Sequence, residues 1–253
     1  ANANANANAN ANANANANSS EAASGSFESR VALVEPTSKI TLDEATAKSQ
    51  LAKYGVPVPV GRSVNSLDEA LLTANSSPSP MVLKALGIAH KTEHNAVRLN
   101  LENEQQLTEA FTELKQLSDS LYLEAMIQGV VAELIVGISR DVQFGLVMTI
   151  GAGGILVEVL KDSTTLLLPA SEYDIADVLS NLKTAALLNG YRGKAVADMP
   201  ATIKAIMAIQ SYALDHSSSL QELDVNPLII CGVGQGAYAA DALIVLNQGD
   251  NHV

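Results

Sequence analysis

The sequence predicts a mixed α+β (α/β) protein built from two lobes. Helical and strand patterns alternate from about Val34 onward, two helices open with capping sequences, and strands rich in β-branched residues crowd together beyond Glu124. We therefore expect a tail and flexible linker over residues 1–33, a small lobe over residues 34–124 and a large lobe over residues 125–247.

The first segment carries no folding signal. Residues 1–18 alternate Ala and Asn, without an apolar period, and residues 19–30 are rich in Ser, Ala, Gly and Glu. Such composition is typical of a flexible linker. Folded sequence is expected to begin near Val34.

The small lobe opens with a helix. Thr41 and Glu44 have the spacing of a capping box, and the helix is expected to run through Tyr54, with Gly55 as its stop. Ser66 and Glu69 form a second capping box before a short helix. The remaining predicted elements of this lobe are a strand at Met81–Ala85, a helix at Glu104–Leu117 and a strand at Leu121–Met126.

The large lobe begins with closely spaced strands, predicted at Ala132–Ser139, Phe144–Ile150 and Ile155–Leu160. Two helices are predicted next, one at Ser171–Leu188 that ends at Gly190, and one at Pro200–Asp215 with Asp198 as its cap. Two strands, Glu222–Ile230 and Tyr238–Val245, complete the lobe.

Composition narrows the class of partner. The 253 residues carry a net charge of -12, so a nucleic acid is not an expected partner, although local groups can still hold a small polyphosphate. No apolar run is long enough to cross a bilayer and no secretory leader is visible, so no membrane association is expected. Cys231 is the only cysteine, which excludes a disulfide framework, and a cytoplasmic location is expected.

Two segments contain ionisable side chains in unusual surroundings. Lys84 lies within an apolar strand, where it could contact phosphate in a cleft or could face solvent on an edge strand. His90, Lys91 and His94 lie on a predicted loop. His90 could accept a phosphoryl group, but a solvated polar loop explains the same residues.

A glycine-rich segment, Gly151–Gly154, separates two predicted strands. Its backbone N–H groups could wrap phosphate oxygens, because glycine has no Cβ to block the approach. A plain hairpin turn would use the same residues. No Gly-Lys-Ser/Thr sequence follows, so the segment is not a Walker loop.

A row of oxygen donors near the C-terminus favours a metal site. Glu222, Asp224 and Asn226 alternate along a predicted strand and should point to one face, and Asp241 on the next strand could complete the set. Mg²⁺ prefers carboxylates together with phosphate oxygens. The alternative is the polar face of an edge strand.

Taken in order, these segments resemble the ATP-grasp (β-type) part of ADP-forming acyl-CoA synthetases, the acetate–CoA ligase relatives of succinyl-CoA synthetase. The likeness extends from Glu35 to Leu246. Its motifs are Glu35-Pro36, Leu51–Pro59, Val82–Ala85, His90-Lys91, Ala132–Gly145, Gly151–Asp162, Gly190–Gly193, Glu222–Leu228 and Asp241-Ala242.

The resemblance implies an ATP-grasp fold, with ATP or ADP held between the two lobes. It implies that Lys84 contacts the phosphates, that Glu124 and Met126 border the adenine, and that Asp224 stands near the transferred phosphoryl group. By the same resemblance, further positions near the nucleotide are Glu133, Gly153 and Gly154, the Mg²⁺ ligands are Asn226 and Asp241, the phospho-carrier is His90, and supporting roles remain open for Lys91, Arg140, Lys161 and Arg192.

The implied activity is that of an acid–CoA ligase (ADP-forming), which needs a CoA-binding α-type subunit or domain, so the chain is expected in a hetero-oligomer or a larger chain. Carboxylic acid and CoA would bind through that partner. One departure is Asn95-Ala96, where relatives usually have two glycines; Asn tolerates positive φ and Ala does so poorly. The alternatives are another ATP-grasp carboxylate ligase, a non-catalytic nucleotide-binding regulatory module and a structural subunit.

Overall fold

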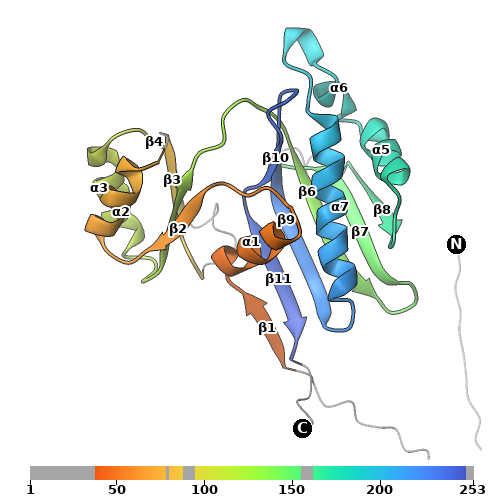
Figure 1. Ribbon diagram of the computed structural model, residues 1–253, viewed down its shortest axis with the longest axis horizontal. Coiled ribbons are helices and arrows are strands. Elements are labelled where there is room, and N and C mark those ends of the chain that lie inside the picture. Colours follow the sequence, from red (N-terminus) through yellow and green to blue (C-terminus); the bar gives the residue numbers. More distant parts are fainter. Residues whose placement is uncertain (1–37, 78–79, 88–94, 155–161, 249–253) are drawn as a thin grey trace, which may run out of the picture. The chain divides into compact units, whose positions relative to one another are not determined.

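The computed structural model describes residues 38–77, 80–87, 95–154 and 162–248. Within these residues the chain forms two antiparallel sheets, one of seven strands and one of four, and helices pack against each (Figure 1). The predicted mixed α+β class is therefore confirmed. The tail and the strand predicted at Ile155–Leu160 lie outside the described residues.

The four-stranded sheet has the strand order β2-β5-β3-β4. Its strands are β2 (Gly61–Val64), β3 (Met81–Ala85), β4 (Val97–Leu101) and β5 (Leu121–Ala125), and its helices are α2 (Leu67–Asn75) and α3 (Glu104–Leu114). The apolar faces of both helices pack on this sheet in one core. The sequence pattern did not predict β2 and β4, because both are short and largely exposed and so lack a clear apolar alternation.

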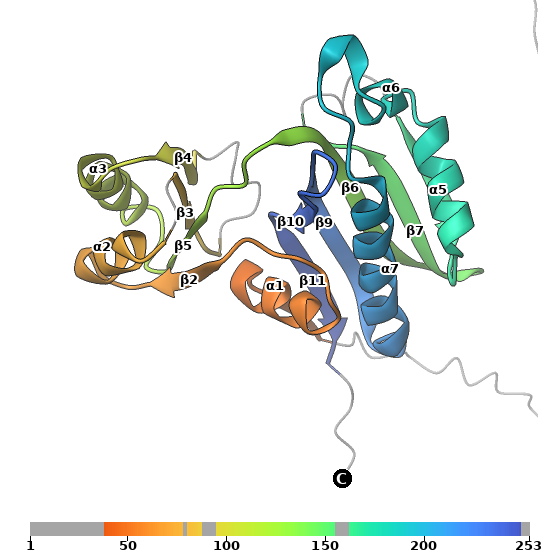
Figure 2. The same ribbon diagram turned by 45° about the horizontal axis from the view of Figure 1, so that its top comes forward.

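The seven-stranded sheet has the order β1-β11-β9-β6-β7-β8, with β10 paired to β9. Its strands are β1 (Lys39–Leu42), β6 (Val130–Asp141), β7 (Gly145–Ala152), β8 (Ser163–Leu167), β9 (Leu220–Cys231), β10 (Ala237–Ala239) and β11 (Ala242–Asn247). Helices α1 (Glu44–Lys53), α5 (Glu172–Asn181) and α7 (Met199–Asp215) lie over one face of this sheet (Figure 2). The short helix α6 (Ala185–Leu188) and the turn η1 (Tyr191–Gly193) connect α5 to α7.

The start of α1 differs from the prediction. Thr41 lies in β1, where it pairs with Val245, and the cap is Asp43, whose carboxylate accepts a hydrogen bond from the N–H of Thr46 at 2.8 Å. Pairing with a strand about two hundred residues away decides the conformation of Thr41, and no local pattern reports it. At the second predicted capping box, the Ser66 hydroxyl accepts from the N–H of Glu69 as expected, but the Glu69 carboxylate accepts from the N–H of Asn65 and not from that of Ser66.

The single helix predicted at Ser171–Leu188 is interrupted. Asp162 accepts hydrogen bonds from the N–H of Lys183 at 2.8 Å, and from the N–H and hydroxyl of Thr184 at 2.8 and 2.9 Å. These bonds compete with the helical pattern, so α5 ends at Asn181 and α6 starts separately. Asp162 therefore has a structural role at this break.

The strand predicted at Tyr238–Val245 is in fact two strands, β10 and β11. They are separated by Ala240 and Asp241, which form a turn beside β9. The N–H of Ala240 donates to Pro227 O, and the N–H of Asn226 donates to Asp241 O at 3.3 Å. The sequence predicts Asp241 within a strand, whereas the structure places it in this turn. We call residues 240–241 the β10–β11 turn.

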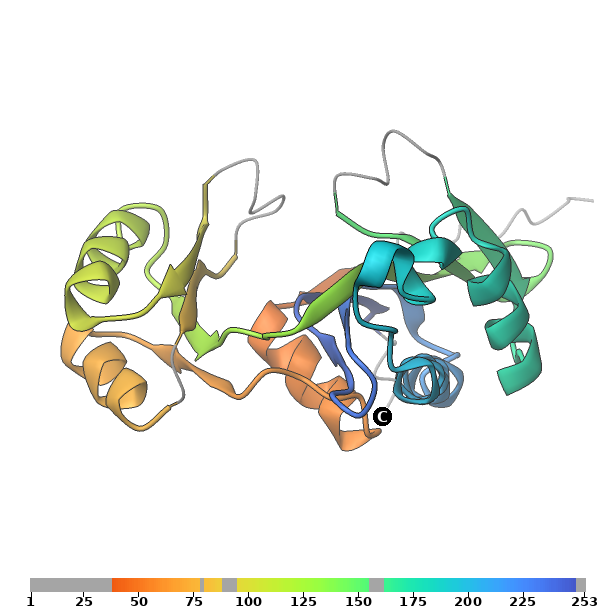
Figure 3. The same cartoon turned by 90° about the horizontal axis from the view of Figure 1, so that it is seen from above.

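The first elements among the described residues belong to the large sheet, although the predicted boundary at Glu124 assigns them to the small lobe. β1 pairs with β11, and Ala47 and Leu51 of α1 lie in the core of the seven-stranded sheet. The chain then crosses to the small sheet before β2 and returns between β5 and β6 (Figure 3). No helix among the described residues is long and apolar enough to cross a membrane.

Candidate functional site

Lys84 occupies the middle of the small sheet. Its strand, β3, lies between β5 and β4 and is buried at every position, which excludes the edge-strand alternative. The side chain is almost fully buried, and its ammonium group lies 2.8 Å from Glu44 Oε1, 2.7 Å from Glu124 Oε1 and 2.8 Å from the carbonyl oxygen of Ala240. Lys84 thus connects the small sheet to α1 and the β10–β11 turn.

A second buried lysine, Lys48 of α1, contacts the same acceptors. Its ammonium group lies 2.9 Å from Glu44 Oε1 and 3.2 Å from Ala240 O, and it pairs with Glu124 Oε2. We call Glu44, Lys48, Lys84 and Glu124 the buried ion cluster. The carboxylate of Glu124, predicted to border an adenine, is directed at both lysines.

The electrostatics of the buried ion cluster keep Lys84 charged. Burial by itself would lower the pKa of Lys84, but the charges of Glu124, Glu44 and Asp241 together raise it above its ordinary value. The same surroundings affect Tyr122, whose pKa is raised to about 12 by burial and by the neighbouring carboxylates. Lys84 therefore remains a permanent cation beside the β10–β11 turn.

Strand β9 presents its polar residues on one face, as the alternation predicted. Leu223 and Val225 are fully buried in the core of the large sheet, whereas Glu222 and Asn226 are exposed and Asp224 is half-buried. Asp241 lies beside Asn226 through the backbone contact already described. The structure thus brings together Asp224, Asn226 and Asp241.

Asp224 lies in a strongly negative environment. Burial, followed by the charges of Glu222 and Asp241, raises the pKa of Asp224 to about 6. Among the described residues no three His, Cys, Asp or Glu side chains form a cluster that could hold a metal by themselves. Mg²⁺ commonly takes one or two protein carboxylates and completes its shell with water and phosphate oxygens. The concentration of negative charge and the hard oxygen donors fit that mode of binding.

Substitution of Asp224 with Asn is expected to stabilise the ligand-free protein. The raised pKa means that the folded state holds the proton more tightly than the unfolded state, so ionised Asp224 opposes folding above about pH 6. Because water screens part of this repulsion, we expect Asp224→Asn to raise the free energy of unfolding by about 1–2 kcal/mol near pH 8. Urea denaturation in the presence of a metal chelator measures this difference.

The pH dependence provides the control for this prediction. The gain should shrink as pH falls from about 6 to about 4, and it should disappear below about pH 3, where the carboxyl is protonated in both states. Asp177→Asn, on an exposed part of α5, should show no such change. A gain that is the same at both pH values would contradict the electrostatic explanation.

The glycine segment approaches β6 closely. The N–H of Gly153 donates to Glu133 O at 2.7 Å, and a Cβ on Gly153 would lie 2.9–3.0 Å from backbone atoms of Glu133 and Leu134. Gly154 has a φ of 66°, and a Cβ there would lie 2.8 Å from Glu133 Oε2. β7 pairs with β8, and residues 153–162 connect the two strands. This connection is longer than the tight hairpin turn that the glycine-rich sequence also allows.

Of the remaining candidate residues, Arg140 and Arg192 lie in the part of the chain that the structure describes, and no contact given above joins either of them to the buried ion cluster. Arg140 donates to the carbonyl oxygens of Leu220 and Ser217 and so fastens the connection from α7 to β9. Arg192 has a φ of 52°, and its guanidinium lies 5.1 Å from the centre of its neighbouring tyrosine ring. His90, Lys91 and Lys161 lie outside the described residues. Asn95 has a φ of 51°, the conformation that Asn was expected to tolerate there.

Sequence reasoning missed the roles of Glu44 and Lys48. The sequence pattern places Glu44 in a capping box, and no motif includes Lys48. Yet Glu44 and Lys48 are four residues apart on the helical face that also buries Ala47 and Leu51. Charged residues are rarely buried unless they are paired. Two of them on the apolar face of a helix, at ion-pair spacing, therefore indicate a buried ion pair with a specific role.

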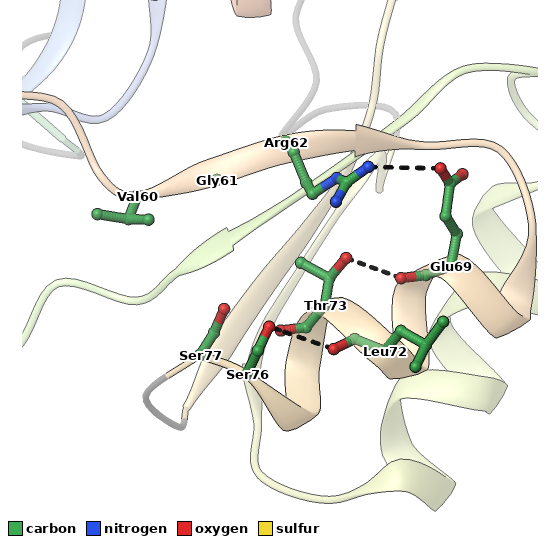
Figure 4. A pocket seen from close by; sticks show the side chains of 8 residues that line it. All are labelled: Val60, Gly61, Arg62, Glu69, Leu72, Thr73, Ser76 and Ser77. Carbon is green, nitrogen blue, oxygen red and sulfur yellow. Dashed lines mark hydrogen bonds and ion pairs between the residues drawn. The ribbon is translucent and has the colours of Figure 1, made fainter.

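Two surface pockets lie away from the acidic face of β9. One, of about 490 Å³, lies between β2 and α2 and is lined by Val60, Gly61, Arg62, Glu69, Leu72, Thr73, Ser76 and Ser77 (Figure 4). It contains none of the candidate residues. The other, of about 330 Å³, includes Met126 in its wall, together with Cys231 and Tyr238. Met126 is fixed there by a backbone hydrogen bond to Pro80 O at 2.9 Å.

Comparison with known proteins gives a consistent result. The model of the ATP-grasp domain family matches residues 34–246. The chain is 32% identical over 213 residues to the acetate–CoA ligase (ADP-forming) II subunit beta of Pyrococcus furiosus, covering 80% of this chain and 90% of that subunit. It is 30% identical over 223 residues to the 4-hydroxybutyrate–CoA ligase (ADP-forming) of Nitrosopumilus maritimus, covering 84% of this chain but only 32% of that protein.

Solved structures agree with these sequence matches. A protein of Pyrococcus horikoshii is similar with a TM-score of 0.75 and 32% identity, over 83% of this chain and 92% of that one. An acetyl-coenzyme A synthetase of Ca. Korarchaeum cryptofilum, described in complex with coenzyme A and Mg-AMPPCP, has a TM-score of 0.71 and 32% identity, over 82% and 93% of the two chains. The ATP-grasp fold expected from the sequence is confirmed.

Proposed function

Because this chain belongs to the ATP-grasp family of ADP-forming acid–CoA ligases, we propose that it transfers a phosphoryl group between Mg-ATP or Mg-ADP and a phosphohistidine. The full reaction interconverts a carboxylic acid, CoA and ATP with an acyl-CoA, ADP and phosphate. In the direction of ATP use, a neutral histidine nitrogen attacks the γ-phosphorus. The bond from that phosphorus to the bridging oxygen breaks, and ADP leaves with the electron pair.

The observation that carries this proposal is the arrangement around the β10–β11 turn. The ammonium group of Lys84 bonds to the carbonyl oxygen of Ala240, the residue before Asp241. Asp224 and Asn226 lie beside the same turn on β9. A permanent cation and a set of hard oxygen donors thus lie next to the same short turn. The binding of a metal-bound polyphosphate requires such an arrangement.

Each residue has a proposed role in that site. Lys84 binds phosphate oxygens, Asn226 and Asp241 hold Mg²⁺, and Asp224 stands near the transferred group. Gly154 offers its backbone N–H group to the phosphates, and Gly153 holds that segment against β6 by donating to the carbonyl oxygen of Glu133. Glu133 supports the segment, and Glu124 and Met126 border the adenine between a small and a large lobe. Mg²⁺, when bound, offsets the negative charge of the phosphates.

The carrier and the partner complete the proposal. His90 is the proposed phospho-carrier, and it lies outside the described residues. Similar β subunits cover most of the length of this chain, whereas in the Nitrosopumilus ligase the matching region is about a third of a longer protein. We propose that a CoA-binding α-type subunit or domain supplies the CoA and carboxylate sites.

Nucleotide-dependent stabilisation of the full chain tests the binding site. Mg-ADP at about one hundred times its Kd should raise the free energy of unfolding by about 2.7 kcal/mol and Tm by roughly 5–10 °C. Asp241→Asn should lose this shift, whereas Asp177→Asn should keep it. An unchanged shift in Asp241→Asn would remove Asp241 from the site.

Labelling with γ-labelled ATP tests the phosphoryl transfer to the histidine. The incorporated phosphate is measured in the same preparations, with and without a CoA-binding partner. The label should be acid-labile, as phosphohistidine is, and absent from His90→Asn. Full labelling of His90→Asn would exclude His90 as the carrier. Complete ligase activity without any partner would favour another kind of ATP-grasp ligase.

A further inference from the structure

The buried ion cluster holds more cations than phosphate binding by Lys84 requires. Lys48 and Lys84 both contact Glu44, Glu124 and the carbonyl oxygen of Ala240. Two positive and two negative side chains therefore balance within a buried volume. Lys48 also lies 4.5 Å from the centre of the Tyr122 ring, where the aromatic face favours a cation.

In this arrangement the ammonium group of Lys84 is already saturated. An ammonium has three N–H donors. Those of Lys84 have three protein acceptors, at 2.7–2.8 Å. To bind a phosphate oxygen, Lys84 must exchange at least one of these partners. Glu44 and Glu124 would then lose part of their compensation while still buried, which is unfavourable for a carboxylate.

Lys48 is placed to prevent that loss. Its side chain is 1% exposed, so it is shielded from solvent. It approaches the same two carboxylates from α1, whereas Lys84 approaches them from β3. We propose that Lys48 is a positioning residue: a fixed counter-ion that retains Glu44 and Glu124 when Lys84 turns to the phosphates of a bound nucleotide.

This inference rests on the proposed phosphate-binding role of Lys84 and extends it to a residue that touches no nucleotide. Lys48 also donates to Ala240 O, so it keeps hold of the β10–β11 turn after Lys84 leaves. Asp241 then stays in place for the metal. The lysine pair thus divides two tasks, binding the ligand and maintaining the site.

The test compares nucleotide affinity in three variants of the full chain, each measured by calorimetric titration with Mg-ADP. In Lys48→Met, movement of Lys84 would leave two buried carboxylates without either lysine, so Kd should rise roughly 10- to 100-fold. Lys48→Arg keeps the cation and should recover much of the loss. In Lys48→Met/Glu44→Gln, the buried side chains that remain after Lys84 moves carry the same net charge as in the wild type. The Kd of this double variant should therefore fall to within roughly fivefold of the wild-type value.

The outcomes separate this inference from its premise. Wild-type protein that fails to bind Mg-ADP contradicts the proposed function itself. Wild-type binding together with a folded Lys48→Met of unchanged Kd overturns the role of Lys48, as does a double variant no better than the single one. If Lys48→Met does not fold, the double variant decides: affinity near the wild-type value supports the role, and a large loss rejects it.

Discussion

Replacement of Lys84 with methionine is expected to lower the kcat/KM of phosphoryl transfer by roughly 10²- to 10³-fold. Lys84 is a permanent cation next to the proposed metal site, and charge on the transferred group must be offset as the bond to ADP breaks. Methionine has a similar length and removes the charge. The rate of labelled phosphate transfer from γ-labelled ATP measures the effect.

The fold should survive this substitution, because Lys48 remains paired with both Glu44 and Glu124. Circular dichroism and thermal unfolding check that point. Lys204→Met, on an exposed position of α7, is the matched control and should leave the transfer rate unchanged. A Lys84→Met protein with the wild-type rate would show that this cation does not take part in transfer.

The largest effect on stability is expected from Glu124→Ala. The carboxylate is buried and pairs with both lysines of the buried ion cluster, so its removal leaves two buried cations short of a partner. Breaking a buried pair in this way costs about 3–5 kcal/mol in the free energy of unfolding. In a domain of this size the corresponding fall in Tm is roughly 6–20 °C.

An exposed ion pair supplies the comparison. Glu113 lies 2.8 Å from Arg98, but its side chain is 59% exposed, so Glu113→Ala should cost no more than about 1 kcal/mol. Equal costs for the two substitutions would contradict the view that burial makes the cluster decisive. The raised pKa of Lys84 adds a pH signature, since the stability it contributes is present below the unfolded pKa of 10.5 and is lost as pH rises further.

The elements that local chemistry determines could be predicted from the sequence. Ser66 caps α2, Asp198 caps α7, and β9 alternates buried apolar residues with polar ones, because each pattern depends on residues within a few positions. The ordered motifs then gave the family, since their combination is far more specific than any one of them.

Features decided by distant parts of the chain could not be predicted in this way. Glu124 binds Lys48, 76 residues away, and the carbonyl of Ala240 binds the same lysine from a separation of 192 residues. The local sequence predicts Thr41 as a helix cap. Its pairing with β11 cannot be predicted locally, because β11 lies about two hundred residues away in the sequence. Asp162 ended a predicted helix through bonds formed across about twenty residues.

The pairing of β1 with β11 has a consequence for synthesis on the ribosome. The small sheet is built from the contiguous stretch Gly61–Ala125, so all of its strands are available once that stretch has emerged. The large sheet must wait, because Lys39 pairs with Asn247 and strand β1 has no partner until β11 has been made. Nascent chains should therefore carry a finished small sheet beside an unfinished large one, whose exposed strand edges make this interval the one most in need of a chaperone.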